Sequence, residues 1–472
     1  MRSPCCTSTA ERRVAVDNGI HSRRAIARVS RAIFWAALLA VRPIQGHETD
    51  GKPPAYPAEK QFRPTPIPDR IVLTWSGDPA RSVDVTWRTD AATRRSALEY
   101  KRADQLLGDL RSGDVPGCDR IHSVGEEFRS DLGVCTIHSL QMNELEPSTR
   151  YVYRVGDGVN WSEWFQFRTA SDRREPFSFV YFGDAQNAVR SLWSRVIREA
   201  HQQAPRAAFM LHAGDLINSA AKDGEWGEWF AAGGWLNGMI PTVATPGNHE
   251  YSGEEDQRRL TKHWTPQFAF PRNGPAGLDE TAYWFDYQGV RFVSLNSNER
   301  IDEQAAWFER LCQDHPAPHW HIATFHHPIY SATKDRDNRG LREAWKPLFD
   351  KYGVDLALQG HDHTYARSAL GGPENASSGA NVQAGDTVYV VSVSGPKMYS
   401  LGDTWPAERM ASGAQLYQVI HIDGDVLNYE ARLATGELYD AFTLKRNGDG
   451  RNELTNRIPN TPEINAVIDE PE

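Results

Sequence analysis

Hydrophobic and polar positions follow two different patterns along the chain. Between Ile71 and about Thr169, apolar side chains alternate with polar ones, which is typical of strands that bury one face. The alternation is clearest in the segments Val83–Trp87 and Tyr151–Val155. It predicts an all-β sandwich over residues 65–171.

Beyond Pro176 the pattern changes to short apolar runs that alternate with helical segments. Such alternation favours an α/β (α+β) core, which we expect over residues 175–446. The expected strands are 177–182, 207–211, 292–295, 322–325, 354–358 and 388–393, and the expected helices are 188–203, 302–313 and 341–352. Short alternating strands return in 415–446, and residues 447–472 are expected to form a loose polar tail.

The N-terminal segment has the composition of a targeting sequence. A basic stretch precedes an apolar run at residues 32–41 and the small residue Gly46, so residues 1–46 are predicted to be a signal peptide and 47–64 a linker. A twin-arginine signal at Arg23-Arg24, a non-cleaved anchor and a start codon further downstream are the alternatives. The resulting expectation is a secreted or periplasmic protein.

Composition excludes several classes of protein. The chain has 472 residues, of which 40% are hydrophobic and 24% charged, so it is long enough for two or three globular domains. Its net charge of −10 disfavours a nucleic-acid partner, and no integral membrane span is expected after signal removal. Cys118 and Cys135 could form a disulfide in an oxidising compartment, which leaves Cys312 as a single thiol.

Clusters of candidate metal ligands follow the apolar runs of the second half. Because the carboxyl ends of strands border the binding crevice of an open α/β sheet, these clusters should converge on one site. A glycine before several of the ligands allows the sharp turn that brings each side chain inward. The clusters are Gly183-Asp184-Ala-Gln186, Gly214-Asp215-Leu-Ile-Asn218, Gly247-Asn248-His249-Glu250, His326-His327-Pro328 and Gly360-His361-Asp362-His363.

The ligand types suit two metal ions. A carboxylate can bridge two ions, imidazoles suit Zn, Fe or Mn, and an amide oxygen can complete one coordination shell. Each cluster alone is weak evidence for a metal site, whereas five clusters in this order are strong evidence for one. His212 is expected to be a core histidine, and Trp226, Trp229 and Trp235, between the second and third clusters, are expected to pack or line a loop.

The ordered motifs GD, GDxxN, GNHE, HHP and GHDH resemble those of the calcineurin-like metallophosphoesterase superfamily. Within it, the chain is most similar to purple acid phosphatases with an N-terminal fibronectin type III-like domain. The segment Leu145–Val155 resembles the tyrosine corner of such domains. The resemblance implies a core of two mixed β-sheets flanked by helices. It further implies that Asp184 and His363 bind one metal, that Asp215 bridges both, that Asn248, His326 and His361 bind the other, and that His249 is the acid beside the leaving group.

Two positions depart from the family pattern. Asn218 stands where purple enzymes place a tyrosine ligand, so the protein should be colourless and its two metals could be Fe, Mn or Zn. Gln186 stands where other members place a ligating histidine, and we expect it to orient a ligand rather than to bind metal. His327 is expected either to touch the substrate phosphate or to pack.

The sequence therefore predicts an acid-phosphatase-like phosphomonoesterase that acts on a small phosphate ester with a metal-activated water. A phosphodiesterase or nucleotidase on the same core is the alternative enzyme, since the motifs do not determine the specificity loops. A surface-binding protein with a vestigial metal site is the alternative of another class. A metallo-β-lactamase-like hydrolase would need HxHxDH, which the segment from His361 to Ala366 does not satisfy.

Overall fold

A computed structural model of the chain describes residues 56–106, 115–253, 257–372, 387–402, 405–466 and 468. Residues Tyr56–Glu472 cluster as one unit through their contacts. The predicted signal peptide and residues 47–55 of the predicted linker lie outside the described residues.

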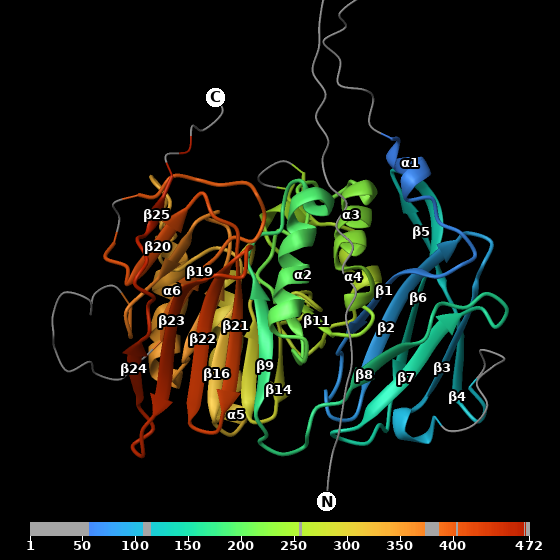
Figure 1. Cartoon of the computed structure of the whole chain (residues 1–472), viewed down its shortest axis with the longest axis horizontal. Coiled ribbons are helices and arrows are strands. Elements are labelled where there is room, and N and C mark those ends of the chain that lie inside the picture. The colour runs from blue at the N-terminus through green and yellow to red at the C-terminus, as the bar shows by residue number, and fades with distance from the viewer. Residues whose placement is uncertain are drawn as a thin grey trace, which may run out of the picture. The chain divides into compact units, whose positions relative to one another are not determined.

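The first part of the described chain is a sandwich of two antiparallel sheets (Figure 1). One sheet has the order β1-β2-β6-β5, with β1 Asp69–Thr74, β2 Val83–Asp90, β6 Gly133–Met142 and β5 Glu126–Ser130. The other has the order β4-β3-β7-β8, with β4 Asp119–Val124, β3 Arg95–Arg102, β7 Arg150–Gly156 and β8 Phe165–Arg168. The short helices α1 (Ala58–Gln61) and η1 (Ala103–Gln105) lie outside the sheets.

The sandwich follows from the alternation of its strands. Val83, Val85 and Trp87 are buried in one core cluster, as period-two packing requires. The hydroxyl of Tyr151 accepts a hydrogen bond of 2.9 Å from the backbone N–H of Glu146, which is the contact of a tyrosine corner.

The cysteines in the described residues are free thiols. Cys118 and Cys135 therefore form no disulfide in the structure. Cys135 is buried on β6 opposite Phe128 of β5, and Cys118 instead donates to the backbone carbonyl of Val115 at 3.1 Å.

The second part contains two larger mixed sheets, as the family resemblance implies. The seven-stranded sheet has the order β11-β10-β9-β21-β22-β23-β24, with β11 Thr242–Ala244, β10 Met210–His212, β9 Phe177–Phe182, β21 Leu416–Asp423, β22 Val426–Leu433, β23 Leu438–Arg446 and β24 Asn452–Asn456. Strands β9, β10 and β11 are parallel, whereas β21 pairs antiparallel with β9.

The eight-stranded sheet has the order β14-β15-β16-β17-β19-β18-β20-β25. Its strands are β14 Tyr283–Tyr287, β15 Val290–Ser294, β16 Trp320–Thr324, β17 Leu356–Gln359, β19 Val388–Val391, β18 Tyr365–Arg367, β20 Arg409–Ser412 and β25 Ile464–Asn465. Strands β15, β16, β17 and β19 run parallel. A separate hairpin joins β12 (Tyr251–Ser252) to β13 (Arg259–Leu260).

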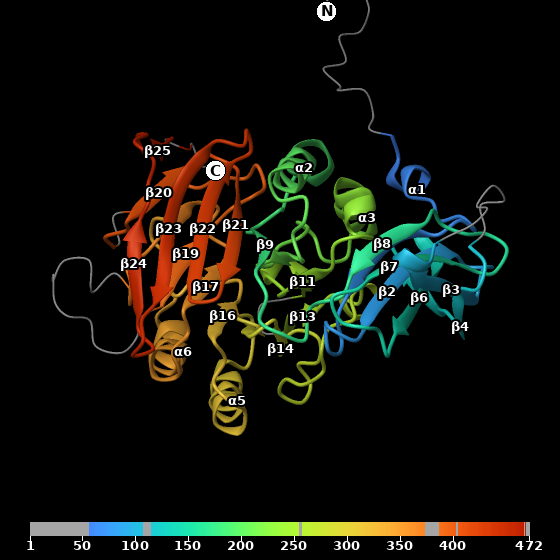
Figure 2. The ribbon, with the colours of Figure 1, turned by 60° about the horizontal axis from the view of Figure 1, so that its bottom comes forward.

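Helices pack on these sheets (Figure 2). The α-helices are α2 Ser194–Gln203, α3 Asp223–Gly233, α4 Trp264–Gln267, α5 Ile301–Asp314 and α6 Arg339–Tyr352; the short turns are η2 Val189–Trp193, η3 Gly234–Leu236 and η4 Asn248–Glu250. Consecutive residues of the parallel strands point to opposite faces. In β17, Leu356 and Leu358 join the main core, whereas Ala357 joins the smaller core beneath α5 and α6.

Several sequence expectations differ from the structure. The segment with Trp226 and Trp229, expected to be a loop, contains helix α3, and the expected helix 188–203 begins with the π-helical turn η2. The expected polar tail contributes β24 and β25 as edge strands. No helix in the described part of the chain is long and apolar enough to cross a membrane.

Buried ion pairs join the sandwich to α3. Asp223, the first residue of α3, accepts hydrogen bonds of 2.7 and 2.9 Å from Arg70 of β1. Arg88 of β2 lies 3.4 Å from the same carboxylate. All three side chains are almost fully buried, so the N-terminus of α3 is held by the sandwich.

Candidate metal centre

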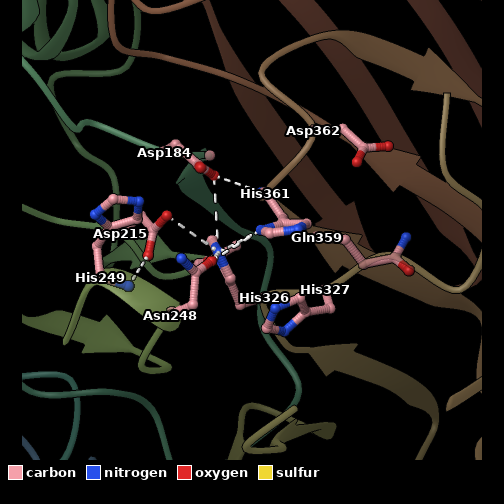
Figure 3. A network of polar contacts seen from close by, with 12 residues as sticks. Asp184, Asp215, Asn248, His249, His326, His327, Gln359, His361 and Asp362 are labelled. Carbon is pink, nitrogen blue, oxygen red and sulfur yellow. Dashed lines mark hydrogen bonds and ion pairs between the residues drawn. The ribbon is translucent and has the colours of Figure 1, made fainter. Parts of the chain in front are cut away.

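The predicted ligand residues come together where strands of both large sheets end. Asp184 follows β9, Asp215 follows β10, Asn248 and His249 lie in η4 after β11, His326 and His327 follow β16, and His361 and His363 follow β17. Figure 3 shows Asp184, Asp215, Asn248, His326 and His361 converging on one point.

Unusual backbone conformations turn these side chains inward. Asp215, His361 and His363 have φ values of 49°, 74° and 48°, in the left-handed region that is costly for residues other than glycine. Gly247 and Gly360 permit close approach, since an added Cβ would lie 2.2 Å from Asp215 Oδ1 and 2.3 Å from Asp184 Oδ1, respectively. The local backbone is therefore shaped around the two carboxylates.

His326 lies at the middle of the cluster. Its Nε2 is 3.2 Å from Asp215 Oδ2, 3.0 Å from Asn248 Oδ1 and 3.2 Å from His361 Nδ1. Asn248 Oδ1 is also 2.9 Å from His361 Nδ1. On the other side of the cluster, Asp184 Oδ2 lies 3.1 Å from His363 Nε2.

The chemistry of this donor set fits metal ions. Asp184, Asp215 and His326 form one group able to hold a cation, and His326, His327 and His361 form a second. Asp184 Oδ2 is buried and accepts no hydrogen bond from the described residues. Burial opposes protonation of His326, yet the charges of Asp215 and Asp184 raise its pKa to about 10. The centre therefore favours positive charge.

A second layer of hydrogen bonds orients the imidazoles. His326 Nδ1 lies 2.9 Å from the carbonyl of Ala213, and His363 Nδ1 lies 2.9 Å from the carbonyl of Lys397. A carbonyl requires a proton on the nitrogen that faces it, so in the neutral ring that a metal ligand needs to be, the lone pair is on Nε2. In each ring this Nε2 faces a carboxylate.

His249 is held beside the cluster by the loop that follows β10. Its backbone N–H donates to Asp215 Oδ1 at 2.8 Å, and its Nδ1 donates to the backbone carbonyl of Asn218. Nε2 of His249 is left for other partners. Asn248, His249, His327 and His361 are half-exposed, whereas Asp184 and Asp215 are buried, so the cluster is approached from the side of these four residues.

The three remaining candidate residues have different surroundings. Both side-chain polar atoms of Gln186 are buried and form no hydrogen bond within the described residues. The side chain of Asn218 contacts Ser219 Oγ at 3.4 Å, so its link to the site is its carbonyl. His327 Nδ1 lies 2.9 Å from Ser297 Oγ, and its ring centroid is 4.3 Å from that of His361.

Sequence reasoning missed Glu250 and Glu225 as organisers of the site. The buried carboxylate of Glu250 accepts backbone hydrogen bonds from Asp215, Leu216 and Gly247 at 2.7–2.9 Å. Burial and the charge of Asp215 raise its pKa to about 8. The carboxylate of Glu225 accepts hydrogen bonds from the backbone N–H groups of Asn218 and Ser219, both at 2.8 Å. The only sequence signal was the place of Glu250 within GNHE.

Two neighbours of the motif histidines are structural. Asp362 points away from the cluster (Figure 3) and accepts hydrogen bonds of 2.8 Å from Ser331 Oγ and the backbone N–H of Ala332. Tyr365 donates to Asp440 at 2.7 Å in the core. His212 is likewise a buried core histidine, whose pKa burial lowers to about 3.

Comparisons with known proteins identify the families that the two parts of the chain match. The calcineurin-like phosphoesterase family matches residues 177–365, and the purple acid phosphatase N-terminal domain matches residues 68–169. Acid phosphatase type 7 of Danio rerio is 28% identical over 347 residues, which cover 65% of this chain and 73% of that protein. Purple acid phosphatase 15 of Arabidopsis thaliana is 26% identical, covering 64% of each chain.

Solved structures share the fold. A purple acid phosphatase from yellow lupin (Lupinus luteus) seeds superposes with a TM-score of 0.67 at 18% identity, covering 81% of this chain and 75% of that one. A structure of PhoD gives a TM-score of 0.61 at 12% identity, covering 85% and 95%. Taken with the metal-binding cluster, these matches show that the chain contains a calcineurin-like phosphoesterase domain behind a purple acid phosphatase N-terminal domain, and they support a metal-dependent phosphoric ester hydrolase.

Proposed function

We propose that the protein is a phosphomonoesterase with a dinuclear metal centre and that His249 protonates the leaving group. The observation that carries the proposal is that Asp215 forms one group with Asp184 and His326, whose ligand atoms lie within 4.8 Å of one another, while its Oδ2 contacts His326, the neighbour of Asn248 and His361. A carboxylate in this position suits the bridge between two ions.

We assign the ligands by their contacts. Asp184 and His363 would hold one ion, a pairing supported by their 3.1 Å approach. Asp215 would bridge, and the second ion would be held by the mutually contacting residues Asn248, His326 and His361. Gln186 and His327 would border the ions or the substrate phosphate without serving as principal ligands.

The residues of the chain divide the work of ester hydrolysis. When bound, the metal ions neutralise charge on the phosphoryl oxygens and lower the pKa of water toward about 7. His249 keeps one proton on Nδ1 for the Asn218 carbonyl, so its Nε2 is the atom that gives a proton to the leaving oxygen. Asp184 and Asp215 are buried, so solvent does not reach the side of the site on which they lie.

Fe, Mn and Zn are the candidate metals. Asn218 offers no phenolate, the ligand that best stabilises ferric iron, so Mn, Zn and ferrous iron are favoured as much as ferric iron. We further propose that residues 65–171 form a fibronectin III-like domain ahead of the catalytic domain at 175–446. Residues 1–46 would direct secretion or periplasmic export.

Hydrolysis by the metal-stripped protein, reloaded separately with Mn, Zn or Fe, tests the proposal. p-Nitrophenyl phosphate and bis(p-nitrophenyl) phosphate are compared side by side, and turnover should need metal and favour the monoester. Preference for the diester would instead indicate a phosphodiesterase. No turnover with any metal would favour the surface-binding alternative.

Matched variants separate the roles of the residues. Asp215→Asn should abolish metal binding and turnover, whereas Asp423→Asn, at the exposed end of β21, should change neither. His249→Asn should keep the metal, measured by elemental analysis, and should slow alkyl phosphates more than p-nitrophenyl phosphate, because a good leaving group needs no proton. Retained turnover in Asp215→Asn would refute the metal-centre assignment.

A further inference from the structure

A cavity with a volume of about 550 Å³ lies between the N-terminal sandwich and the large mixed sheets. Its lining comes from β7 and β8 of the sandwich, from the first residue of β9, and from the loops that follow α2 and η3. Small-molecule sites typically have volumes of about 300–1,000 Å³, so this cavity has the size of a ligand site. It is called here the amino-end pocket.

The amino-end pocket is separate from the metal centre. Phe177, the first residue of β9, and Ala208, shortly before β10, line the pocket. Asp184 and Asp215 follow the opposite ends of the same two strands, which run parallel. Because a strand rises about 3.3 Å per residue, the length of β9 separates the two sites by about 20 Å. A small molecule in the pocket would therefore not reach the metal centre.

The lining of the pocket is partly aromatic. Phe167, Phe177 and Tyr287 are buried there, and the rings of Phe177 and Tyr287 lie 4.7 Å apart. Trp235 also lines the pocket and is 52% exposed, although its side chain is large and apolar. Aromatic rings attract one another beyond the area that they bury, so this lining favours a ligand with an aromatic ring.

Three arginines also line the pocket. They are Arg150 at the start of β7, Arg168 at the end of β8 and Arg206 in the loop after α2. All three are exposed, and their side chains form no ion pair or hydrogen bond within the part of the chain that the structure describes. Among the described lining residues, Glu175 is acidic, so three positive charges face one negative charge.

Two of these arginines repel each other across neighbouring strands. Arg150 of β7 is directly opposite Arg168 of β8 in the antiparallel pair. Like charges in such a position destabilise a sheet, and here no acidic side chain pairs with either of them. An anion bound beside the two guanidinium groups would relieve this repulsion.

The lining also contains a polar atom without a partner. Nδ1 of His201 is buried and forms no hydrogen bond within the described residues, and the ring of His201 meets the edge of Trp235 at 5.2 Å. Burial lowers the pKa of this imidazole. A buried polar atom left unpaired costs free energy, so the pocket favours a ligand that carries a polar group as well as a ring.

The charges of the lining favour one kind of anion. Guanidinium groups match the planar fork of a carboxylate, with which they form paired hydrogen bonds. The negative charge of Glu175 beside the arginines opposes a dianion more than a monoanion. A carboxylate, which carries one charge, therefore suits the pocket better than a phosphate monoester does.

We propose that the amino-end pocket binds a small aromatic carboxylate, with its ring against Trp235 and its carboxylate among Arg150, Arg168 and Arg206. Because the lining comes from both the sandwich and the large sheets, the bound molecule stabilises the contact between them. This site goes beyond the proposed hydrolysis and needs neither the metal ions nor turnover.

The test is isothermal titration calorimetry of the metal-loaded full chain with 2-naphthoate. Two analogues separate the contributions: 2-naphthamide keeps the ring without the charge, and octanoate keeps the carboxylate without the ring. We expect 2-naphthoate to bind about tenfold more tightly than either analogue. Its affinity should fall as ionic strength rises, and inorganic phosphate added at constant ionic strength to occupy the metal centre should leave it unchanged.

Variants of the lining should weaken binding in different ways. Arg168→Gln should reduce the affinity for 2-naphthoate about three- to tenfold and leave that for 2-naphthamide unchanged, because only the carboxylate meets the guanidinium group. Trp235→Ala should weaken both ligands about fivefold. Arg198→Gln, which removes an exposed arginine of α2 outside the described lining, is the matched control and should change neither affinity.

The outcomes separate this inference from the proposed function. Equal affinities for 2-naphthoate and 2-naphthamide, or no heat of binding up to about 1 mM ligand, would overturn it. Displacement of 2-naphthoate by inorganic phosphate at constant ionic strength would also overturn it, since the ligand would then occupy the metal centre. Tighter binding of 2-naphthylphosphonate would overturn the choice of a carboxylate. Each of these results leaves the phosphomonoesterase standing, because none of them measures hydrolysis.

Discussion

The position of the proposed acid His249 should depend on Glu225, a residue outside every motif. Glu225 lies in the first turn of α3 and accepts the backbone N–H groups of Asn218 and Ser219. The carbonyl of Asn218 in turn accepts the Nδ1 proton of His249. We therefore expect Glu225→Ala to displace the acid and Glu225→Gln to keep it near its place.

The magnitude follows from the geometry. Both bonds are 2.8 Å long and converge on one oxygen, Oε2, and bonds to an ionised acceptor contribute about 1.5–3 kcal/mol each. Because the loop is half-exposed, water can replace part of this hydrogen-bond energy. Glu225→Ala should therefore lower the free energy of unfolding by about 3 kcal/mol. Glutamine keeps one acceptor oxygen for both donors and loses only the charge, so its cost should be about 1 kcal/mol.

The kinetic effect should be specific to proton donation. A misplacement of about 1 Å costs roughly 100-fold, so Glu225→Ala should lower kcat on an alkyl phosphate by about tenfold to 100-fold. The effect on p-nitrophenyl phosphate should be smaller, since its leaving group departs without a proton. Glu225→Gln should stay within about fivefold of the wild type, as its bonds are retained.

A double-mutant cycle with His249→Asn decides whether the effect passes through the acid. In the His249→Asn background, Glu225→Ala should change kcat on the alkyl phosphate less than about twofold, because the group that Glu225 positions is gone. An equal fold-loss in both backgrounds would refute the reasoning and would mean that Glu225 acts on the metal centre or on the fold as a whole.

Three further measurements check other parts of the structure. Asp223→Asn removes the charge that pairs with buried Arg70 and Arg88 and should lower the free energy of unfolding in urea by about 3–5 kcal/mol; an unchanged midpoint would contradict the importance of this ion pair. Burial lowers the pKa of His321 to about 3, against about 6.5 in the unfolded chain, so the unfolded state alone takes up this proton as pH falls below 6.5. The wild type should thus lose about 2 kcal/mol more stability than His321→Leu between pH 6.5 and 4.5, and parallel stability curves would refute the burial argument. Reloaded with ferric iron, the protein should show no tyrosinate charge-transfer band in the visible absorption spectrum. Such a band would contradict this expectation and would mean that a tyrosine elsewhere in the chain binds the iron.

The sequence predicted the elements that carry the site because their burial is simple. Strand β9 was expected at 177–182 and is observed there, since a strand buried on both faces is one apolar run. Helices α5 and α6 lie within two residues of the expected bounds. Each has one apolar stripe against the sheet, and that stripe produces the helical period.

Helix α3 escaped prediction for the opposite reason. Its buried positions include Gly227, Ala232 and Gly233 besides Trp226, Trp229 and Phe230, so they spread over more than one face and the amphipathic period is weak. Gly224, Gly227 and Gly233 are also poor helix formers. Strands β24 and β25 were missed because exposed edge strands are polar on both faces.

The residues of the site also divide into those that the sequence predicts and those that it does not. The ligand-type residues were identified because their motifs are short and ordered, and the structure brings them into contact. Glu225 could not be identified, because it acts through a hydrogen bond from the backbone N–H of the motif residue Asn218. A backbone carbonyl or N–H is present at every position, so such contacts leave no pattern in the sequence.

The departure at Asn218 can be understood from these backbone contacts. The support of His249 is the carbonyl of residue 218, and Glu225 holds the N–H of the same residue. Any side chain at this position supplies both groups. Asparagine at the position where the family resemblance implies a tyrosine ligand should therefore leave the support of the proposed acid His249 in place. Since Asp223 ties the start of α3 to Arg70 and Arg88 of the sandwich, we expect the N-terminal sandwich to stabilise the helix whose Glu225 supports the Asn218 loop beside His249.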